Sequence, residues 1–352
     1  MRIDKLPVIG EKCYLFKDRL NRRYFSGFDI AEGFLLCAET SVYFTDLRYY
    51  SAAKDKISKA GITPRVYSGF DDVAAEIRAQ KIKTVYIDYT RTTLSEWEEY
   101  KKRFGNVEIA DCSEEITALR RVKDESETES IKKACAIAER AVNEAFSHLY
   151  EGMTERELKK FVEDRMSALG GEGAAFDTIV AFGKNAAVPH HETGDAQLIA
   201  NQAVLIDTGA KVNGYCSDIT RTAFFGEPDD EFLKAYNAVL DANVKAEEEI
   251  YVGLSGKAAD KIVRDVLTAR GYGEYFTHSL GHGVGLEIHE SPYLSPKSDE
   301  ILDNGTVFTV EPGVYIDGRF GIRIEDTCIM ENGRAKRLFT DDKKPRIISA
   351  EK

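Results

Sequence analysis

The feature that most constrains the fold is an internal repeat at a spacing of 101 residues. In both copies a start signal, an amphipathic helical pattern and a stopping glycine fall in the same register. The matching pairs are Gly152 and Gly253, Thr154 and Ser255, Phe161 and Ile262, Val162 and Val263, Asp164 and Asp265, Met166 and Leu267, and Gly170 and Gly271. A duplication predicts strands that pair across a pseudo-two-fold axis, with helices outside. Two unrelated amphipathic helices are the alternative.

A smaller α/β domain is expected before the repeat. Residues 33–38 and 41–46 are apolar runs close enough for a hairpin, residues 84–88 form another predicted strand, and residues 94–104 have a helical pattern. The D-x-x-E signal at Asp124 and Glu127 then starts a long helix. The predicted domains are therefore residues 1–118 and 119–352.

Composition excludes several classes of partner. The 352 residues carry a formal net charge of −12, which argues against nucleic acid or an anionic membrane. No apolar run approaches the length of a membrane span, and the first residues are too charged for a signal peptide. The six cysteines are scattered without a C-x-x-C pair. We expect a cytoplasmic protein with reduced thiols.

Two acidic residues fall on strands that a tight turn would pair. The run V-L-I-D-T-G places Asp207 at its end, C-S-D-I-T-R-T places Asp218 in the next strand, and Asn213-Gly214 is a strong hairpin signal between them. This turn predicts that Asp207 faces Thr220 and that both carboxylates share one face. Buried carboxylates that converge repel each other unless a cation lies between them. An exposed aspartate pair is the alternative.

The pattern recurs with Glu311 in V-F-T-V-E-P-G and Glu325 in G-I-R-I-E-D-T. A two-residue turn at Asp317-Gly318 would put these two glutamates on opposite faces. We therefore predict a bulge, at Pro312-Gly313, or a longer loop that restores their convergence. Arg323, two residues before Glu325, shares its face and is placed to orient or neutralise a carboxylate.

Residues 277–290, T-H-S-L-G-H-G-V-G-L-E-I-H-E, hold three of the six histidines among three glycines. The glycines disfavour a helix that would align His278 and His282, and they allow close backbone approach. A hydrogen-bonded core histidine is the alternative for any one of them. Two aspartates, two glutamates and one imidazole suit a pair of divalent ions, with Mn²⁺ preferred and Co²⁺, Zn²⁺ or Fe²⁺ also suitable.

These motifs resemble the pita-bread metallopeptidases, which include aminopeptidase P, prolidase and methionine aminopeptidase. The resemblance rests on D-T-G, G-Y-C-S-D-I-T-R-T, H-S-L-G-H-G-V-G-L-E-I-H-E, V-E-P-G-V-Y and R-I-E-D, and it covers residues 119 to about 344. It implies an α/β creatinase-like N-terminal domain, an α+β pita-bread catalytic domain with pseudo-two-fold duplication, and two metal ions per subunit. The implied ligands are Asp207, Asp218, His282, Glu311 and Glu325.

The resemblance also implies a reaction. Glu311 would move the proton of a water shared by the metals, and His190, His278 and His289 would surround the substrate and the tetrahedral intermediate. His191 follows His190 directly, so the sequence leaves open which of these two imidazoles reaches the substrate.

The expected substrates are short peptides with proline in the second position, cleaved at the Xaa-Pro bond by an aminopeptidase P-like exopeptidase. An Xaa-Pro dipeptidase, or prolidase, is the main alternative. Methionine aminopeptidase-like activity and a non-catalytic peptide-binding relative are less favoured, because a separate N-terminal domain precedes the site and every ligand position is retained. The family further implies a homodimer.

Overall fold

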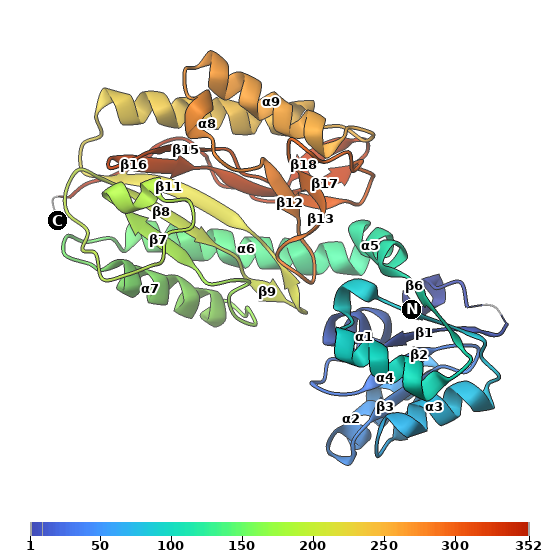
Figure 1. The fold of residues 1–352 in the computed structure, drawn as a ribbon. Coiled ribbons are helices and arrows are strands. Elements are labelled where there is room, and N and C mark those ends of the chain that lie inside the picture. The colour runs from blue at the N-terminus through green and yellow to red at the C-terminus, as the bar shows by residue number, and fades with distance from the viewer. Residues whose placement is uncertain (1, 9, 351–352) are drawn as a thin grey trace. The chain divides into compact units, whose positions relative to one another are not determined.

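The structure is a computed structural model that describes residues 2–8 and 10–350. It comprises two compact units, Met1–Leu119 and Arg120–Lys352 (Figure 1).

The first unit is built on one six-stranded mixed sheet, in the order β4-β3-β2-β1-β5-β6. Its strands are β1 (Lys12–Phe16), β2 (Phe34–Cys37), β3 (Val42–Thr45), β4 (Thr63–Val66), β5 (Thr84–Ile87) and β6 (Glu108–Asp111). Its helices are α1 (Arg19–Ser26), α2 (Leu47–Ile57), α3 (Phe70–Ala79) and α4 (Leu94–Phe104), with short 3₁₀ turns η1 (Arg2–Lys5), η2 (Ser58–Ala60) and η3 (Tyr89–Arg91). Helix α5 (Ser113–Arg121) reaches the boundary between the units.

Alternation along β1 decides which helices cover which face of this sheet. Cys13 and Leu15 belong to a core cluster with residues of α3 and α4. Phe16 instead stacks on Phe25 of α1, with ring centroids 4.8 Å apart. Successive side chains of a strand point to opposite faces, so helices cover both faces of the sheet. The small α/β domain predicted from the sequence, including the β2–β3 hairpin, is confirmed.

The second unit is built on a nine-stranded sheet in the order β13-β12-β14-β17-β11-β8-β7, with β18 beside β17 and β19 beside β11. The strands of the unit are β7 (Ile179–Phe182), β8 (Gln202–Thr208), β9 (Lys211–Val212), β10 (Tyr215–Cys216), β11 (Ile219–Phe225), β12 (Gly281–Gly283), β13 (Glu290–Leu294), β14 (Val307–Val310), β15 (Gly313–Ile316), β16 (Phe320–Arg323), β17 (Glu325–Glu331), β18 (Arg334–Arg337) and β19 (Arg346–Ile348). Its helices are α6 (Glu125–Ser147), α7 (Glu155–Ala168), α8 (Asp230–Glu249) and α9 (Gly256–Ala269), with 3₁₀ turns η4 (Gly183–Ala187) and η5 (Gly273–Tyr275).

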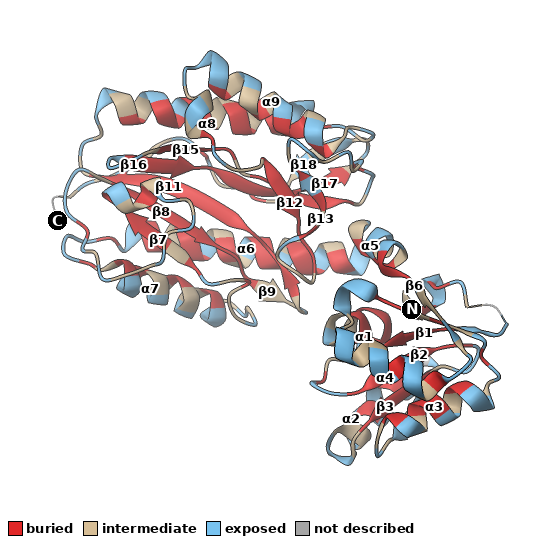
Figure 2. Ribbon diagram, in the orientation of Figure 1, coloured by how far each residue is buried: buried red, intermediate tan, exposed pale blue. Residues whose placement is uncertain are grey.

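The predicted duplication is confirmed. Helices α7 and α9 have the same length and begin 101 residues apart, capped by Thr154 and Ser255. Helices α6 and α7 pack in one core with β7, β8 and β11, whereas α8 and α9 pack in a second core with β14 and β16. In Figure 1 the two helix pairs flank the sheet from opposite sides, and Figure 2 shows that the faces they turn to it are buried. The halves meet where β11 pairs with β17.

The first acidic hairpin forms as predicted. Asn213 and Gly214 both have positive φ, at 49° and 73°, as a two-residue type I′ turn requires. The register that follows places Thr220 opposite Asp207. Asp218 and Asp207 therefore lie on one face of the hairpin.

The second acidic hairpin corrects part of the prediction. Gly313 pairs with Arg323 and Val310 pairs with Asp326, so one register continues through the interruption at Glu311 and Pro312, and the predicted bulge there is wrong. The predicted alternative, a longer loop, is confirmed, because Asp317, Gly318 and Arg319 lie between the paired residues Ile316 and Phe320. This longer loop restores the parity and places Glu311 opposite Glu325.

Two further sequence expectations can be compared with the structure. All six cysteines are buried and free. Within residues 2–8 and 10–350, no helix combines the length and the apolar character that crossing a bilayer requires.

Candidate metal centre

A cavity of about 510 Å³ opens in the second unit over the β11–β17 junction. Every residue that the sequence predicted for the site lines it: Asp207, Asp218, His282, Glu311, Glu325, His190, His278, His289 and Arg323. Phe176, Ile179, Ile288 and Tyr293 add an apolar and aromatic wall. Elements that are more than a hundred residues apart in the chain therefore meet at one site.

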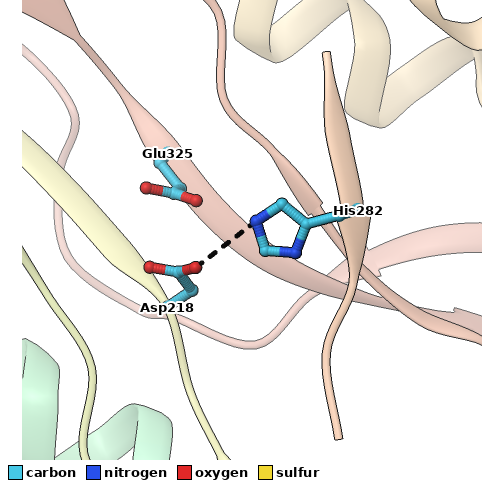
Figure 3. A group of neighbouring side chains, drawn as sticks. All are labelled: Asp218, His282 and Glu325. Atoms are coloured by element: carbon cyan, nitrogen blue, oxygen red, sulfur yellow. Dashed lines mark ion pairs between the residues drawn. The ribbon is translucent and has the colours of Figure 1, made fainter. Parts of the chain in front are cut away.

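Three side chains from three strands or strand ends converge most closely. One ligand atom each from Asp218, His282 and Glu325 lies within 4.8 Å of the others, and all three residues are buried (Figure 3). His282 Nε2 lies 3.6 Å from Asp218 Oδ2 and 3.4 Å from Glu311 Oε1. Asp218 precedes β11, His282 is the middle residue of β12, and Glu325 begins β17.

The carboxylates of this group oppose one another's ionisation. Burial, followed by repulsion from neighbouring carboxylates, raises the pKa values of Asp218 and Glu325 well above their usual ranges. Burial and repulsion from Asp207 raise the pKa of Glu311 to about 8, even though Arg323 acts in the opposite direction. A divalent cation between the carboxylates would remove this repulsion.

The imidazole of His282 is held in the form that a metal ligand needs. Its Nδ1 atom lies 3.1 Å from the carbonyl oxygen of Gly283, which assigns the N–H to Nδ1 and leaves the Nε2 lone pair directed at Asp218 and Glu311. Burial, with a smaller contribution from His289, lowers the pKa of His282 to about 4. The ring is therefore neutral at pH 7.

Two buried carboxylate oxygens that belong to this site have no hydrogen-bond donor among the residues that the structure describes. These are Oδ1 of Asp207 and Oδ1 of Asp218. Buried acceptors without a partner are costly, so each needs a ligand in the cavity. Oxygen donors that outnumber a single neutral nitrogen fit hard or borderline divalent ions. The residues present thus fit a divalent metal centre.

Arg323 connects several members of the site. Its Nη2 donates to Asp207 Oδ2 at 2.5 Å, and its Nε donates to Thr220 Oγ1 at 3.0 Å. Thr220 Oγ1 in turn donates to Glu325 Oε2 at 2.6 Å. Arg323 is 4% exposed. The carboxylate that Arg323 contacts directly is that of Asp207, and it reaches Glu325 through Thr220.

Three polar residues beside this centre, Thr220, Thr309 and Tyr315, were not predicted to take part in it, although Thr220 was expected opposite Asp207. Thr309 Oγ1 accepts from the backbone N–H of His282 and donates to Glu311 Oε1. The hydroxyl of Tyr315 lies 2.9 Å from Arg323 Nη1 and 2.8 Å from His278 Nε2. Strand alternation was a usable signal, because 309, 311, 313 and 315 share one parity.

The accessory histidines differ in how firmly they are held. His278 Nδ1 lies 2.8 Å from Ser279 O and its Nε2 faces Tyr315, while burial and then Arg323 lower its pKa to about 4. His289 is exposed, and its ring stands at 66° to that of His282 with centroids 4.2 Å apart. The side of the ring that faces the cavity is partly shielded from water, and this partial desolvation lowers the pKa of His289.

The structure also separates the two adjacent histidines. His190 lines the cavity, whereas His191 binds the buried carboxylate of Glu155.

Comparison with known proteins gives the family. Residues 129–332 match Metallopeptidase family M24, and residues 9–122 match the Creatinase/Prolidase N-terminal domain.

Individual relatives are similar along nearly the whole chain. The chain is 38% identical to an Xaa-Pro dipeptidase of Pyrococcus furiosus, with 91% of this chain and 90% of that protein covered. An X-Pro aminopeptidase structure from Thermotoga maritima superposes with a TM-score of 0.93 at 37% identity, covering 99% of this chain and 100% of that one. An Xaa-Pro dipeptidase structure from Bacillus anthracis superposes with a TM-score of 0.92 at 35% identity, covering 96% of this chain and 95% of that one. The chain belongs to metallopeptidase family M24, with a creatinase/prolidase N-terminal domain before its catalytic domain, and the family implies that it works with divalent metal ions.

Proposed function

We propose that the protein is a metal-dependent exopeptidase that hydrolyses the Xaa-Pro bond at the N-terminus of peptides. Asp207, Asp218, His282, Glu311 and Glu325 hold two divalent ions, with Mn²⁺ preferred and Co²⁺, Zn²⁺ or Fe²⁺ as alternatives. The observation that carries this proposal is that the five side chains line one cavity, where two carboxylate oxygens, of Asp207 and Asp218, have no donor in the described part of the chain.

Two bound divalent ions supply Lewis acidity that activates water and polarises a carbonyl. The protein supplies the rest of the chemistry. Glu311 takes the proton of the attacking water and delivers it to the leaving nitrogen. His190, His278 and His289 line the same cavity and surround the substrate. His190 and His289 donate to the developing oxyanion, whereas His278, whose two ring nitrogens contact Ser279 and Tyr315, shapes the cavity wall. Arg323 holds Asp207 and, through Tyr315, His278.

Substrate length is the finer part of the proposal. The guanidinium of Arg323, the arginine that lines the cavity, is already engaged with Asp207, Thr220 and Tyr315. It is therefore not free to bind the C-terminal carboxylate of a dipeptide, which favours peptides that continue past the proline. The similarity to an X-Pro aminopeptidase agrees with this, whereas the similarity to Xaa-Pro dipeptidases supports the second candidate, a prolidase.

Peptide hydrolysis by purified protein, loaded with Mn²⁺ after chelation, tests the proposal. Gly-Pro-type dipeptides are compared with matched Xaa-Pro-Yaa tripeptides. Cleavage of the tripeptide supports the aminopeptidase, and cleavage of the dipeptide alone identifies a prolidase. If the metal-loaded protein hydrolyses neither peptide, the proposal is contradicted, and methionine-type substrates or a peptide-binding role are favoured.

Three further expectations belong to this proposal. A homodimer is expected from the family resemblance, and light scattering at several protein concentrations tests it.

The free, buried thiols agree with a reducing cytoplasm, which we keep as the proposed compartment. The domain boundaries remain the proposed 1–118 and 119–352, and expression of residues 119–352 alone tests them.

A further inference from the structure

The β11–β17 junction carries much of the metal centre but has few pairing contacts of its own. Only Ile219 with Asp326 and Thr220 with Glu325 are paired between these strands. Asp218 directly precedes this junction and Glu325 lies within it. The separation of their carboxylates therefore depends on whatever else holds the two strands together.

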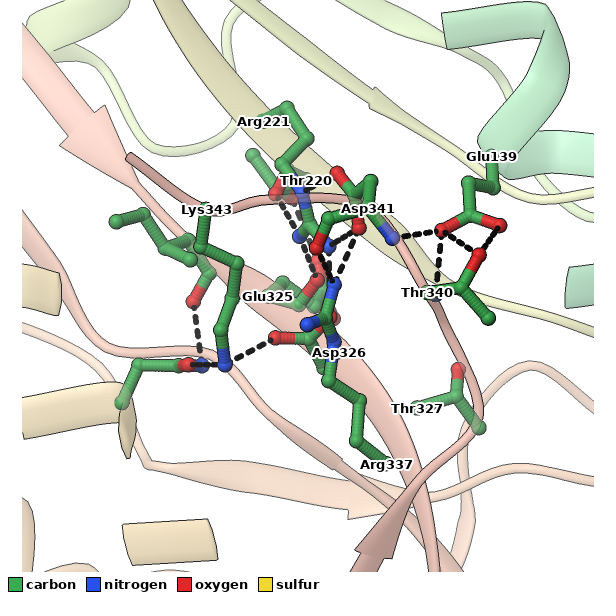
Figure 4. Close-up of polar contacts among 12 residues, drawn as sticks. Glu139, Thr220, Arg221, Glu325, Asp326, Thr327, Arg337, Thr340, Asp341 and Lys343 are labelled. Carbon is green, nitrogen blue, oxygen red and sulfur yellow. Dashed lines mark hydrogen bonds and ion pairs between the residues drawn. The ribbon is translucent and has the colours of Figure 1, made fainter. Parts of the chain in front are cut away.

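Thr327 Oγ1 makes one connection, with the backbone N–H and carbonyl of Asp218. Arg221 makes another from the opposite face to Thr220, because it follows Thr220 in the strand. Its Nη1 donates to the backbone carbonyls of Thr220 and Glu325, at 2.9 and 2.6 Å. Its Nη2 donates to Asp326 Oδ1 and Asp341 Oδ1, and its Nε donates to Asp341 Oδ2, all at 2.7 Å (Figure 4). All five guanidinium N–H groups are therefore used, and the residue is 5% exposed.

Asp341 forms a two-pronged pair with this guanidinium and is itself held in place. Its side chain is 6% exposed, and it also accepts from Arg337. The backbone N–H groups of Thr340 and Asp341 donate to Glu139 of α6, each at 2.5 Å. The segment around Asp341 is thereby tied to α6, in the first half of the duplicated unit.

Lys343 ties the same segment to the second half. Its Nζ lies 2.5 Å from Asn243 Oδ1 and 2.7 Å from Glu247 Oε2, both on α8, and 3.2 Å from Asp326 Oδ2. Residues 337–343, which we name the C-terminal brace, thus link α6, β11, β17 and α8 at the back of the metal centre. The brace lies beyond residue 332, where the match to the metallopeptidase family ends.

We propose that Asp341 is a positioning residue for the metal centre. By orienting Arg221, it fixes the backbone carbonyls of Thr220 and Glu325 and so sets where the Glu325 carboxylate lies relative to Asp218. The inference rests on the proposed metal-binding role of these two residues. Residues that support metal ligands from behind commonly change metal affinity by about 10- to 100-fold when they are replaced.

The test compares Asp341→Asn with Asp342→Asn. Asp342 is the adjacent acid, but its side chain is 68% exposed and pairs with the exposed Lys344. Each full-length protein is stripped of metal, and Mn²⁺ is titrated in by calorimetry to obtain stoichiometry and Kd. Thermal unfolding of the metal-free forms is measured in parallel. We expect Asp341→Asn to weaken Mn²⁺ binding about 10- to 100-fold and Asp342→Asn to leave it unchanged.

An unaltered Mn²⁺ Kd in a folded Asp341→Asn protein overturns the inference, even if its metal-free form melts earlier, because the residue then only stabilises the fold. If Asp341→Asn does not fold, the Mn²⁺ Kd of Arg337→Gln tests the inference in its place. Arg337 contacts Asp341 and also Asp326, and its side chain is more exposed than that of Asp341. A Kd at least threefold weaker supports the inference that this network positions the ligands, and an unchanged Kd overturns it. Wild-type protein that binds Mn²⁺ but cleaves no proline peptide contradicts the proposed function alone, since the affinity comparison still stands. Wild-type protein that binds neither Mn²⁺, Co²⁺ nor Zn²⁺ overturns both.

Discussion

The Nε2 atom of His191 lies 2.9 Å from a carboxylate oxygen of Glu155, whose side chain is fully buried. Glu155 also accepts from the backbone N–H groups of Phe182 and Gly194 and from the side chain of Asn185. His191 therefore belongs to a buried hydrogen-bonded cluster that shapes the loop around His190.

This relationship predicts opposite consequences for the two adjacent histidines. His190→Ala should lower kcat/KM about 100-fold, because it removes a donor in the cavity, and should leave the melting temperature unchanged because His190 is exposed. His191→Ala should destabilise the fold by about 1–3 kcal/mol, since it removes a partner of a buried carboxylate, with a smaller effect on kcat. Steady-state kinetics and thermal unfolding of both variants check this, and the reverse pattern would assign the substrate contact to His191.

Replacing Glu311 by glutamine tests the proposed proton transfer. Glu311→Gln keeps the shape of the side chain but cannot accept a proton, so kcat should fall by about 10²- to 10⁴-fold. Glu274→Gln is the control, because Glu274 is exposed and does not line the cavity. The measurement is kcat with the bound Mn²⁺ determined on the same samples. A variant with full metal content and wild-type kcat would exclude Glu311 as the base.

Removing the metal should make stability depend on pH. The folded-state pKa of Glu311 is raised to about 8 from 4.5, and the pKa values of Asp218 and Glu325 are also raised. At a pH between the unfolded-state and folded-state pKa values, the folded protein therefore binds more protons than the unfolded chain. Stability contributed in this way is lost as the pH rises. The lowered pKa values of His278 and His282, about 4 against 6.5, act in the opposite direction but only below pH 6.5.

The free energy of unfolding of metal-free protein should therefore fall by at least about 1 kcal/mol between pH 6.5 and 8. Saturating Mn²⁺ should abolish this fall, because it holds the carboxylates ionised without repulsion. Urea unfolding with and without Mn²⁺ at several pH values measures both effects. Stability of the metal-free protein that rises over this interval would contradict the carboxylate repulsion.

The glycine before His282 should not tolerate a side chain. A Cβ at Gly281 would lie 2.1 Å from the carbonyl oxygen of Thr309 and 2.7 Å from its Oγ1, which also contacts His282 and Glu311. Gly281→Ala should therefore destabilise the protein by about 1–3 kcal/mol and weaken Mn²⁺ binding. Gly69→Ala is the matched control, because no atom lies within 4 Å of its Cβ position and its φ of 176° is extended. Equal unfolding energies for the two variants would contradict the predicted steric clash.

The sequence by itself determined the features that depend on neighbouring residues. The capping pairs Asp124 with Glu127 and Thr154 with Glu157 start α6 and α7, as their spacing predicts. Asn213-Gly214 forms its type I′ turn because both residues accept positive φ, and strand alternation then places Asp207 and Asp218 on one face. The repeat at 101 residues determined that two similar halves would pair.

Tertiary structure alone decided which distant groups meet. Glu311 and Glu325 face each other because the turn at 317–319 has three residues, not two. The sequence alone does not predict the length of a turn reliably. His190 and His191 have the same chemistry and adjacent positions, and only the burial of Glu155 separates them. Asp341 reaches Arg221 across 120 residues. Such contacts depend on the order of the strands and on where the C-terminal segment packs, and both are properties of the folded sheet.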